Sequence, residues 1–364
     1  MKIGYVLRSL EDSGVTVYCL RLAEAMRRRG HDVFLVSDGG VYADEVTRRG
    51  LRHHHLPLCR GPLRSLLAAR RLADIVRAER PDILHGNWRR GQMACHLAEK
   101  ATGVPYVTTL HLVGIPDSWL YRRLSHWGRL TIAPCSEAVV YLQERFGVPQ
   151  ERLRLIFHGA DPDQWPATDA AARGRARVEL GLSDQAIVAV CVARLEAIKD
   201  HATMLRGLAH AAESCPQFHL LLVGDGGERA SVEAVILQLG LAAHVRVMGF
   251  CDPHPALAAA DVFLLTSLRE SFGFAPIEAM LTGLPVVRTA TQGAADQVRP
   301  GQTGEIIPIG DAAAVARVLL DVAARPEVWR DRGRAARDLA AREFTLAAMA
   351  EKTERAYEDV LAAG

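Results

Sequence analysis

Two glutamates, Glu270 and Glu278, lie eight positions apart on either side of a turn in which Gly273 separates two phenylalanines. The apolar run Val262 to Leu265 before the turn predicts a buried strand, and Pro276 after it is typical of the first position of a helix. Backbone N–H groups at a helix start favour anions, and carboxylates accept hydrogen bonds from sugar and ribose hydroxyls. The stretch therefore indicates a ligand-binding loop at the carboxyl end of a strand, where open α/β sheets bind their ligands.

Each glutamate alone has a simpler explanation. Glu278 in the first turn of a helix is a favourable charge beside the helix dipole, and Glu270 alone would be a solvated loop residue. The two together are more specific, because they enclose a glycine and aromatic turn between a strand and a short helix. Gly283 and Pro285 end that helix, and another apolar strand follows.

Two basic residues follow a second apolar strand. The run Ile187 to Val192 predicts a strand, Arg194 comes after its end, and Lys199 opens the next helix. Each alone would be an ordinary surface charge. Cations at a strand end and at the following helix start can nevertheless converge on one anion.

The segment Arg269 to Val286 resembles the E-x7-E signature of retaining glycosyltransferases of family 4, which have the GT-B fold. The likeness continues through Gly301-Gln-Thr-Gly304 and covers nearly the whole chain, most densely from Val192 to Gly304. It implies an α/β fold of two Rossmann-like domains that face each other across a cleft. The implied activity is transfer of a sugar from a nucleoside-diphosphate sugar of the UDP or GDP type to an acceptor hydroxyl, with retention at the anomeric carbon and without a cofactor.

The resemblance also implies roles for individual residues. Arg-Leu-x-x-x-Lys after an apolar strand resembles the family's diphosphate clamp, and the strand Val245 to Gly249 with Phe250 matches the end of the strand beside the base pocket. Glu278 is suited to ribose hydroxyls, and Glu270 to the sugar. The implied catalytic residues are Glu270, His111, Arg194 and Lys199, and the implied donor-binding residues are Gly14, Arg194, Lys199, Gly249, Phe250, Glu270, Phe272, Gly273, Phe274 and Glu278, with no metal ligand among them.

Two features of the first half join this set. Gly14 follows the first predicted strand, and a glycine there lets the backbone approach a phosphate. The family usually has two adjacent glycines at this place, whereas Ser13 replaces one of them here. Val107 to His111 looks like the family's strand ending in a histidine that touches the donor sugar. A lone histidine near a strand end is more often structural, and this alternative stays open for His111 and for His85.

The elements that must position these residues alternate between apolar strands and longer helical patterns, which predicts doubly wound parallel sheets. The expected domains are 1–160 for the acceptor, 161–343 for the nucleotide-sugar donor, and a terminal helix, 344–364, that crosses back to the first domain. The predicted strands are Ile3 to Leu7, Val33 to Val36, Ile83 and Leu84, Tyr106 to Leu110, Thr131 to Ala133, Leu153 to Phe157, Ile187 to Val192, Phe218 to Val223, Val245 to Gly249, Val262 to Leu265, and Val286 with Val287.

Composition limits the other possibilities. The 364 residues suffice for two domains, and a net charge of +2 gives no support for a nucleic-acid partner. Seven cysteines without a C-x-x-C pair suggest reduced thiols and a cytoplasmic location. The longest apolar run, Ala186 to Ala193, is too short to span a bilayer. Arg60 to Arg80 predicts a surface helix with a solvated basic face, and contact with anionic lipid of the inner membrane surface or with an anionic acceptor is the alternative.

Two short patterns could suggest a metal. Asp161-Pro-Asp163 spells D-x-D, the metal motif of a different glycosyltransferase fold, but its position matches a linker. His53 to His55 alternate between the two faces of a predicted polar strand, so the three side chains cannot all bind one ion. The sequence favours a metal-independent enzyme, with the basic pair in place of a cation.

The sequence leaves several alternatives. A nucleotide-sugar 2-epimerase shares the GT-B fold and the clamp but lacks this E-x7-E pattern, and a non-catalytic nucleotide-sugar-binding protein would not need the whole set. The acceptor is a glycan, a lipid-linked molecule or a small molecule, in bacterial glycan, glycolipid or secondary-metabolite synthesis. Its contacts are expected on loops of the first domain such as Gly114 to Trp127.

Overall fold

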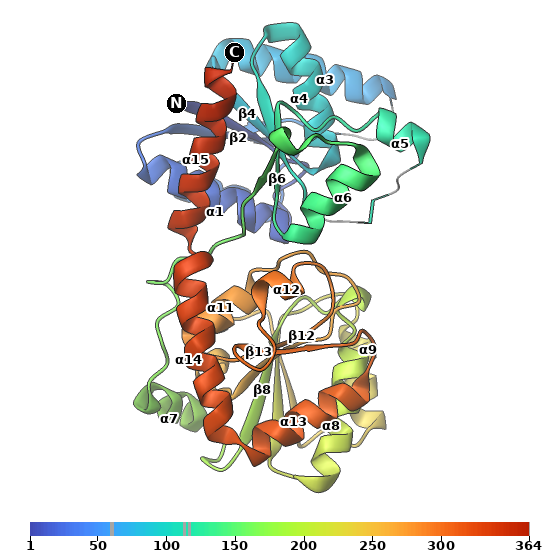
Figure 1. Ribbon diagram of the computed structural model, residues 1–364, viewed down its shortest axis with the longest axis vertical. Helices are drawn as coiled ribbons and strands as arrows, with labels where there is room; N and C mark the ends of the chain where they lie inside the picture. Colours follow the sequence, from blue (N-terminus) through green and yellow to red (C-terminus); the bar gives the residue numbers. More distant parts are fainter. Residues whose placement is uncertain (59–61, 112–113, 116–117, 364) are drawn as a thin grey trace. The chain divides into compact units, whose positions relative to one another are not determined.

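The computed structural model describes residues 1–58, 62–111, 114–115 and 118–363 and divides into two compact units (Figure 1). The first unit consists of Met1–Gly159 together with Leu346–Gly364, and the second unit is Ala160–Thr345. Each unit is an α/β structure built on one parallel sheet, as the alternation of apolar runs and helical patterns predicts.

The first unit contains a seven-stranded sheet in the order β3-β2-β1-β4-β5-β6-β7, with every neighbouring pair parallel. Its strands are β1 (Lys2–Val6), β2 (Asp32–Ser37), β3 (Arg52–His55), β4 (Ile83–Asn87), β5 (Tyr106–Thr109), β6 (Leu130–Ala133) and β7 (Leu153–Leu155). Its helices are α1 (Gly14–Arg28), α2 (Ala43–Arg48), α3 (Pro62–Glu79), α4 (Trp88–Thr102), α5 (Trp119–Arg123), α6 (Ser136–Phe146) and α15 (Leu346–Ala362), with a 3₁₀ turn at Gln150–Arg152.

The second unit contains a six-stranded parallel sheet in the order β10-β9-β8-β11-β12-β13. Its strands are β8 (Ile187–Val192), β9 (Phe218–Val223), β10 (Val245–Gly249), β11 (Val262–Leu265), β12 (Val286–Thr289) and β13 (Gly304–Ile307). Its helices are α7 (Ala170–Glu179), α8 (His201–Ser214), α9 (Arg229–Gln238), α10 (His254–Ala259), α11 (Ala275–Thr282), α12 (Ala294–Gln297), α13 (Ala312–Ala324) and α14 (Pro326–Glu343), with a 3₁₀ turn at Ala197–Lys199.

Both sheets have the strand order of a Rossmann-like unit. Successive strands extend the sheet in one direction from a central strand, and the chain then returns to the other side of that strand and continues the opposite way. The reversal falls between β1 and β4 in the first unit and between β8 and β11 in the second. Loops at the carboxyl ends of these two pairs therefore run in opposite directions and leave room for a ligand.

The loop with the two glutamates enters its helix as the sequence predicts, with one small difference. Helix α11 begins at Ala275, so Pro276 is its second residue and not its first. Proline is tolerated in the first turn because its missing N–H has no partner there in any case. Gly283 ends the helix with a left-handed φ of 95°.

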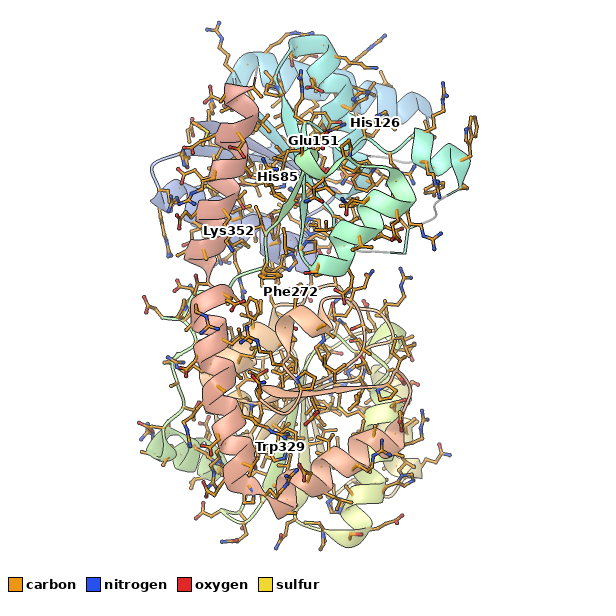
Figure 2. The ribbon with its side chains drawn as sticks, in the orientation of Figure 1. His85, His126, Glu151, Phe272, Trp329 and Lys352 are labelled. Atoms are coloured by element: carbon orange, nitrogen blue, oxygen red, sulfur yellow. The ribbon has the colours of Figure 1, made fainter. Side chains whose placement is uncertain are left out.

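A buried histidine connects helix α15 to the first sheet (Figure 2). His85 on β4 is fully buried, with Nε2 at 2.7 Å from Thr109 Oγ1 and Nδ1 at 2.6 Å from the hydroxyl of Tyr357 on α15. The Tyr357 hydroxyl in turn donates to the Tyr5 hydroxyl at 3.1 Å. Figure 1 shows α15 beside α1, and one face of α15 is buried through Met349, Thr353, Ala356 and Tyr357. Thus His85 is a structural residue of the first unit.

The predicted basic helix is α3, which packs against α4. Its residues Ala68, Leu72 and Val76 belong to the hydrophobic core, whereas Arg70, Arg71 and Arg77 are exposed. This arrangement is that of an amphipathic surface helix. Arg60 and the side chains of Leu63 and Leu66, which were part of the same prediction, lie outside the described residues. No helix in the described part of the chain is long and apolar enough to cross a membrane.

We predict that His85 makes the first unit less stable in acid. Burial lowers the pKa of His85 to about 3, whereas an unfolded histidine has a pKa of about 6.5. Below the unfolded pKa, the unfolded chain binds a proton that the folded state does not, so the free energy of unfolding must fall as the pH falls. His85→Gln removes this proton and should flatten the dependence, by about 1.4 kcal/mol per pH unit. Urea unfolding of both proteins at several pH values measures the two slopes, and equal slopes would contradict the prediction.

Candidate functional site

Two connections meet at the carboxyl ends of β8 and β11, where the strand order of the second unit reverses. The first runs from Ala193 to Asp200 and includes the 3₁₀ turn, and the second runs from Thr266 to Phe274. Thr266 Oγ1 donates to the carbonyl of Asp200 at 2.9 Å, and Leu268 N–H donates to the carbonyl of Ile198 at 2.8 Å. These bonds tie the two connections together, so that residues far apart in sequence share one surface.

Lys199 and Glu270 form an ion pair on this surface, with Nζ at 2.5 Å from Oε2. Each side chain keeps only 16% of its area exposed. Burial alone would raise the pKa of Glu270, but the charge and hydrogen bond of Lys199, and then the charge of Arg288, hold the pKa below its ordinary value. The carboxylate is therefore ionised at neutral pH, and the two residues present a matched donor and acceptor to a ligand.

Arg194 lies in the same β8–α8 connection but has another partner. Its Nη1 is bonded to the carboxylate of Glu196, and 42% of the arginine side chain is exposed. The structure therefore brings the two predicted cations to one connection, although each is paired with a different carboxylate. A ligand phosphate would have to share or replace these carboxylates.

The glycine-rich turn after β9 supports the segment that carries Arg194. A Cβ at Gly224 would lie 2.0 Å from the carbonyl oxygen of Ala193, and one at Gly226 would lie 2.4 Å from that of Leu195. Leu195 N–H also donates to the carbonyl of Asp225 at 2.9 Å. The glycines are required here for close approach of two backbone segments.

The glycine turn between the glutamates has a conformation that only glycine adopts at little cost. Gly273 has a φ of 72°, and an added Cβ would lie 3.4 Å from Pro276 Cδ. Phe272, which is labelled in Figure 2, is fully buried. It packs edge-on against Phe344, with ring centroids 5.2 Å apart. Only the backbone of Phe272 is thus available for the predicted donor contact. Glu278 lies in the first turn of α11 with 8% of its area exposed.

Arg288, which was not predicted as a site residue, holds this turn by hydrogen bonds to its carbonyls. Arg288 lies on β12, between β11 and β13 in the sheet, and is fully buried. Its guanidinium donates to the carbonyls of Phe272 at 3.3 Å and Ser271 at 3.5 Å, and also to Gln297 Oε1. Gln297 Nε2 in turn donates to the carbonyl of Gly273 at 3.3 Å. The available signal was a charged residue that directly follows two valines in a predicted buried strand. A buried arginine needs several hydrogen-bond acceptors, so its position predicts carbonyl groups held around it.

This network determines where the amide groups of the turn are directed. The peptide bond is planar and trans, so the carbonyl of one residue and the N–H of the next are directed oppositely. Since the carbonyls of residues 271 and 272 accept from Arg288 and that of residue 273 accepts from Gln297, each N–H of residues 272–274 is directed away from the side chain that holds the preceding carbonyl. Backbone N–H groups of such a turn are donors of the kind that suits an anion or sugar oxygens.

The predicted base-pocket residues lie at the end of β10, on the same edge of the sheet. Gly249 has a φ of 71°, and its carbonyl accepts a hydrogen bond from Gly224 N–H at 2.8 Å. Phe250 is 77% exposed, which is unusual for a phenylalanine. An exposed aromatic ring at this edge is available for stacking against a planar ligand.

In the first unit, Gly14 and Ser13 form the start of α1. Gly14 is the first residue of the helix, and Ser13 is its N-cap, with Oγ accepting from Thr16 N–H at 3.2 Å. An added Cβ at Gly14 would meet no atom within 4 Å. The serine that replaces one family glycine therefore has a capping role.

His111 follows strand β5 and is held by Asn87. Asn87 Nδ2 donates to the carbonyl of His85 at 3.1 Å, so its Oδ1 accepts the proton of His111 Nε2 at 2.8 Å. Burial, followed by the neighbouring His158 and His85, lowers the pKa of His111 well below its ordinary value. The neutral ring then has Nδ1 as an acceptor for a hydroxyl group.

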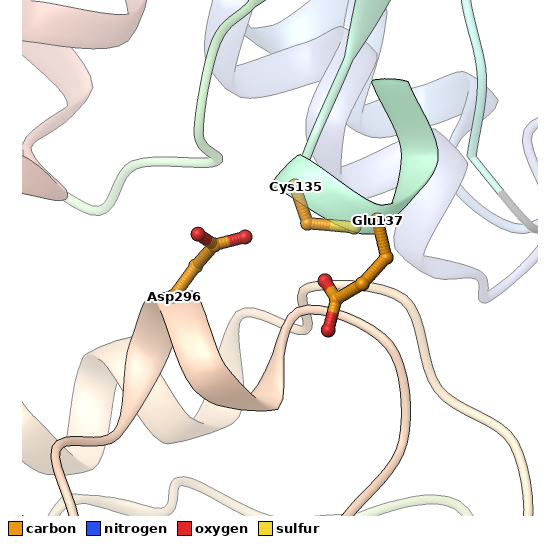
Figure 3. Close-up of side chains that lie close together, drawn as sticks. All are labelled: Cys135, Glu137 and Asp296. Carbon is orange, nitrogen blue, oxygen red and sulfur yellow. The ribbon is translucent and has the colours of Figure 1, made fainter. Parts of the chain in front are cut away.

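The histidines and aspartates of the patterns that could suggest a metal have other partners in the structure. His53, His54 and His55 contact three different partners, namely Ser37 at 2.8 Å, Glu79 at 2.7 Å and Asp38 at 3.6 Å. Asp161 Oδ1 accepts from the N–H of Asp163 at 3.2 Å, which is a local turn. Figure 3 shows Cys135 and Glu137 at the start of α6, in the first unit, and Asp296 on α12, in the second unit.

Two Rossmann-like units with this loop at the reversal of the second sheet define a glycosyltransferase of the GT-B fold, and comparisons with known proteins agree. Residues 173–339 match the family described as Glycosyl transferases group 1, and residues 13–164 match Glycosyltransferase Family 4. The chain belongs to the family 4 glycosyltransferases, which confirms the resemblance seen in the E-x7-E segment.

Relatives and solved structures extend over the whole chain. N-acetyl-alpha-D-glucosaminyl L-malate synthase of Bacillus anthracis is 24% identical over 99% of this chain and 97% of its own length. D-inositol 3-phosphate glycosyltransferase of Corynebacterium jeikeium is 29% identical over 96% of this chain and 93% of its own. The crystal structure of Anabaena HepE in complex with UDP has a TM-score of 0.88 at 22% identity, covering 99% of this chain and 100% of that chain. Sucrose-phosphate synthase from Thermosynechococcus elongatus has a TM-score of 0.83 at 22% identity, with full coverage of both chains. The GT-B fold is therefore confirmed.

We predict that Arg288→Met destabilises the second unit by about 2 kcal/mol or more, because it leaves buried carbonyls and the Gln297 side chain without their donor. Arg288→Lys should recover little, since an ammonium cannot replace the planar fork. Arg317→Met on α13 is the control, because it removes an arginine with 69% of its side chain exposed. Urea unfolding compares the three variants, and a loss for Arg288→Met no larger than that for Arg317→Met would contradict the assigned role.

Proposed function

We propose that this glycosyltransferase moves a sugar from a nucleoside-diphosphate sugar to an acceptor hydroxyl with retention and without a metal ion. The observation that carries the proposal is the Lys199–Glu270 pair beside the Gly273 turn at the reversal of the second sheet. This place offers a cation, an ionised carboxylate and backbone N–H groups together. A diphosphate joined to a sugar needs these three kinds of group.

The departing diphosphate needs positive charge. Lys199 and Arg194 supply it from the β8–α8 connection, and the amides of residues 272–274 add donors whose direction is already fixed. Pre-oriented donors stabilise developing charge without reorganisation in the transition state. We therefore assign to the basic pair the role that a divalent cation has in other glycosyltransferases.

The sugar and the nucleoside contact different residues in this proposal. Glu270 accepts from sugar hydroxyls, and neutral His111 offers Nδ1 as a further acceptor for the sugar. Glu278 accepts from the ribose hydroxyls, and Phe250 stacks on the base. These roles follow the family resemblance, and the burial and charge of the described residues are compatible with them.

Retention follows from attack on the face that the diphosphate leaves. The anomeric C–O bond breaks with its electron pair going to the leaving phosphate oxygen, and the acceptor oxygen bonds to the anomeric carbon on the same face. The acceptor proton passes to that phosphate oxygen. Retaining glycosidases instead use a carboxylate nucleophile. Glu270 is held by Lys199 and lies beside the turn, so we assign it to orientation of the sugar and not to attack.

Comparison proteins support UDP as the nucleotide. Solved structures of Anabaena HepE contain UDP, UDP with glucose, and UDP-glucose. The curated relatives are named for different acceptors, namely L-malate, 2-deoxystreptamine and D-inositol 3-phosphate, so the names do not identify one acceptor. We place the enzyme in bacterial glycan, glycolipid or secondary-metabolite synthesis in the cytoplasm. The comparisons give no support to the 2-epimerase alternative.

We predict that UDP-glucose or UDP-N-acetylglucosamine, incubated without an acceptor, is slowly hydrolysed or stays intact, because water is then the only molecule to which a transferase can move the sugar. An epimerase would change the sugar at C2, which NMR detects. The same incubation with an acceptor should give product with unchanged anomeric configuration, and EDTA should not lower the rate. Loss of activity with EDTA that Mg²⁺ restores would contradict metal independence.

We predict unequal effects of the two glutamates. Glu278→Gln loses charge-assisted hydrogen bonds to ribose, each worth about 1.5–3 kcal/mol, and should weaken binding of UDP as well as of the UDP-sugar. Glu270→Gln releases Lys199 from its ion pair, so UDP should bind at least as tightly as to the unchanged protein, while sugar transfer falls. Calorimetric titration with both ligands separates the two effects. If Glu270→Gln weakens UDP as much as Glu278→Gln does, the division of roles is wrong.

A further inference from the structure

A cavity of about 550 Å³ lies in the first unit, at the start of helix α4. Helix α4 follows β4, so the cavity is on the carboxyl edge of the first sheet. Its described walls combine aromatic and apolar side chains with arginines and include no carboxylate: Trp88, Arg89, Arg90, Met93, His111, Tyr121 and Trp127 are among them. A cavity of this kind fits a small ligand with an apolar part and a negative group.

The first turn of α4 has no side-chain cap. Its N-cap residue is Asn87, but the Asn87 side chain makes no capping bond, because it holds His85 and His111 instead. The first turn contains no acidic residue, and Trp88 has a left-handed φ of 68°. Strain of this kind at a non-glycine residue is typical of functional sites.

Two arginines lie where a helix dipole favours a negative charge. Arg89 and Arg90 are the second and third residues of α4, so their charges add to the positive end of the helix. Positive side chains at the positive end of a helix dipole are unfavourable, and a bound anion would offset this repulsion. Arg90 Nη1 donates to the carbonyl of Leu58 at 3.1 Å.

Arg89 is held in place for binding. Its guanidinium lies over the ring of Tyr121, with Cζ 3.8 Å from the ring centre. Its Nη1 is buried and has no hydrogen-bond partner among the described residues. Stacking on an aromatic ring leaves the planar edge of an arginine free of the ring, and this edge matches the two oxygens of a carboxylate or phosphate.

We propose that this cavity binds the acceptor, and that the acceptor carries an anionic group, a carboxylate or a phosphate monoester, held by Arg89 and the N–H groups at the start of α4. The proposal rests on the proposed function, since it names the substrate class of the same reaction. The rest of the acceptor packs against Trp88 and Trp127. His111 in the cavity wall places the acceptor beside the residue assigned to the donor sugar.

The first test measures anion binding to the full chain at saturating UDP, which occupies the Lys199 and Arg194 site and leaves the cavity as the anion site under study. Glycerol, glycerate and glycerol 3-phosphate are titrated by calorimetry. We expect one or both anions to bind at least 10-fold more tightly than glycerol, and the difference between them identifies carboxylate or phosphate as the preferred group. Equal binding of all three would overturn the proposal.

Variants locate the binding. Arg89→Gln should lower the anion affinity at least 10-fold. Arg70→Gln, which removes an exposed arginine of α3, should leave the anion affinity unchanged. Met93→Glu is a second variant in case Arg89→Gln folds poorly, because a carboxylate one turn after Arg89 would pair with it and repel the anion. Unchanged anion affinity in folded Arg89→Gln and Met93→Glu would overturn the assignment to this cavity.

The second test measures sugar transfer to matched pairs, such as an inositol and its monophosphate, or a triol and the corresponding hydroxy acid. We expect kcat/KM to favour the anionic member of a pair at least 10-fold, and Arg89→Gln to remove this preference without changing UDP affinity. Equal transfer to the neutral member would overturn the proposal. Failure of UDP to bind at all would instead overturn the proposed function, and the comparison of Arg89→Gln with Arg70→Gln, made without UDP, would then still decide whether the cavity binds anions.

Discussion

All strands of each sheet run parallel, and this constraint decides where a ligand can bind. Parallel strands require a crossover on one face for every connection, so the loops at the carboxyl edge cover most of that edge. The covering opens only where the chain reverses direction, at β1 and β4 in one unit and at β8 and β11 in the other. Lys199, Glu270 and the Gly273 turn lie at one of these places, and the start of α4 lies at the other.

Arg194 and Lys199, the two predicted cations of the candidate site, differ in how firmly their carboxylate partners hold them. The Arg194–Glu196 pair is about 40% exposed on both sides, and an exposed pair contributes about 0–1 kcal/mol, so an anionic ligand can displace its carboxylate easily. The Lys199–Glu270 pair is mostly enclosed, and separating an enclosed pair leaves a charge without its partner. Lys199 is therefore held in one position, whereas Arg194 can change its partner more readily.

Much of the fold could be predicted because strands covered on both faces are short apolar runs. In the second unit, β8, β9, β10 and β11 have the predicted bounds. Strand β13 was not predicted, since it begins with Gly304, whose lack of a side chain permits contact with the Val286 carbonyl. The spacing of Glu270 and Glu278 indicated the site loop, and a family pattern added Arg194 and Lys199. Sequence could not show that Lys199 pairs with Glu270, that Phe272 faces the core, or that Arg288 holds the turn, because these contacts depend on side chains brought together by distant strands.

The second unit is an insertion within the first. The chain leaves the first unit after Gly159 and returns at Leu346, and the Ala160 N–H donates to the Phe344 carbonyl at 3.0 Å, so departure and return are neighbours. On a ribosome, β4 with His85 is synthesised long before its partner Tyr357. Every residue of the second unit is synthesised before Tyr357. The first unit to begin folding is therefore the last to be completed. Until α15 arrives, the nascent first unit has an uncovered apolar face on α1, a surface of the kind that chaperones bind.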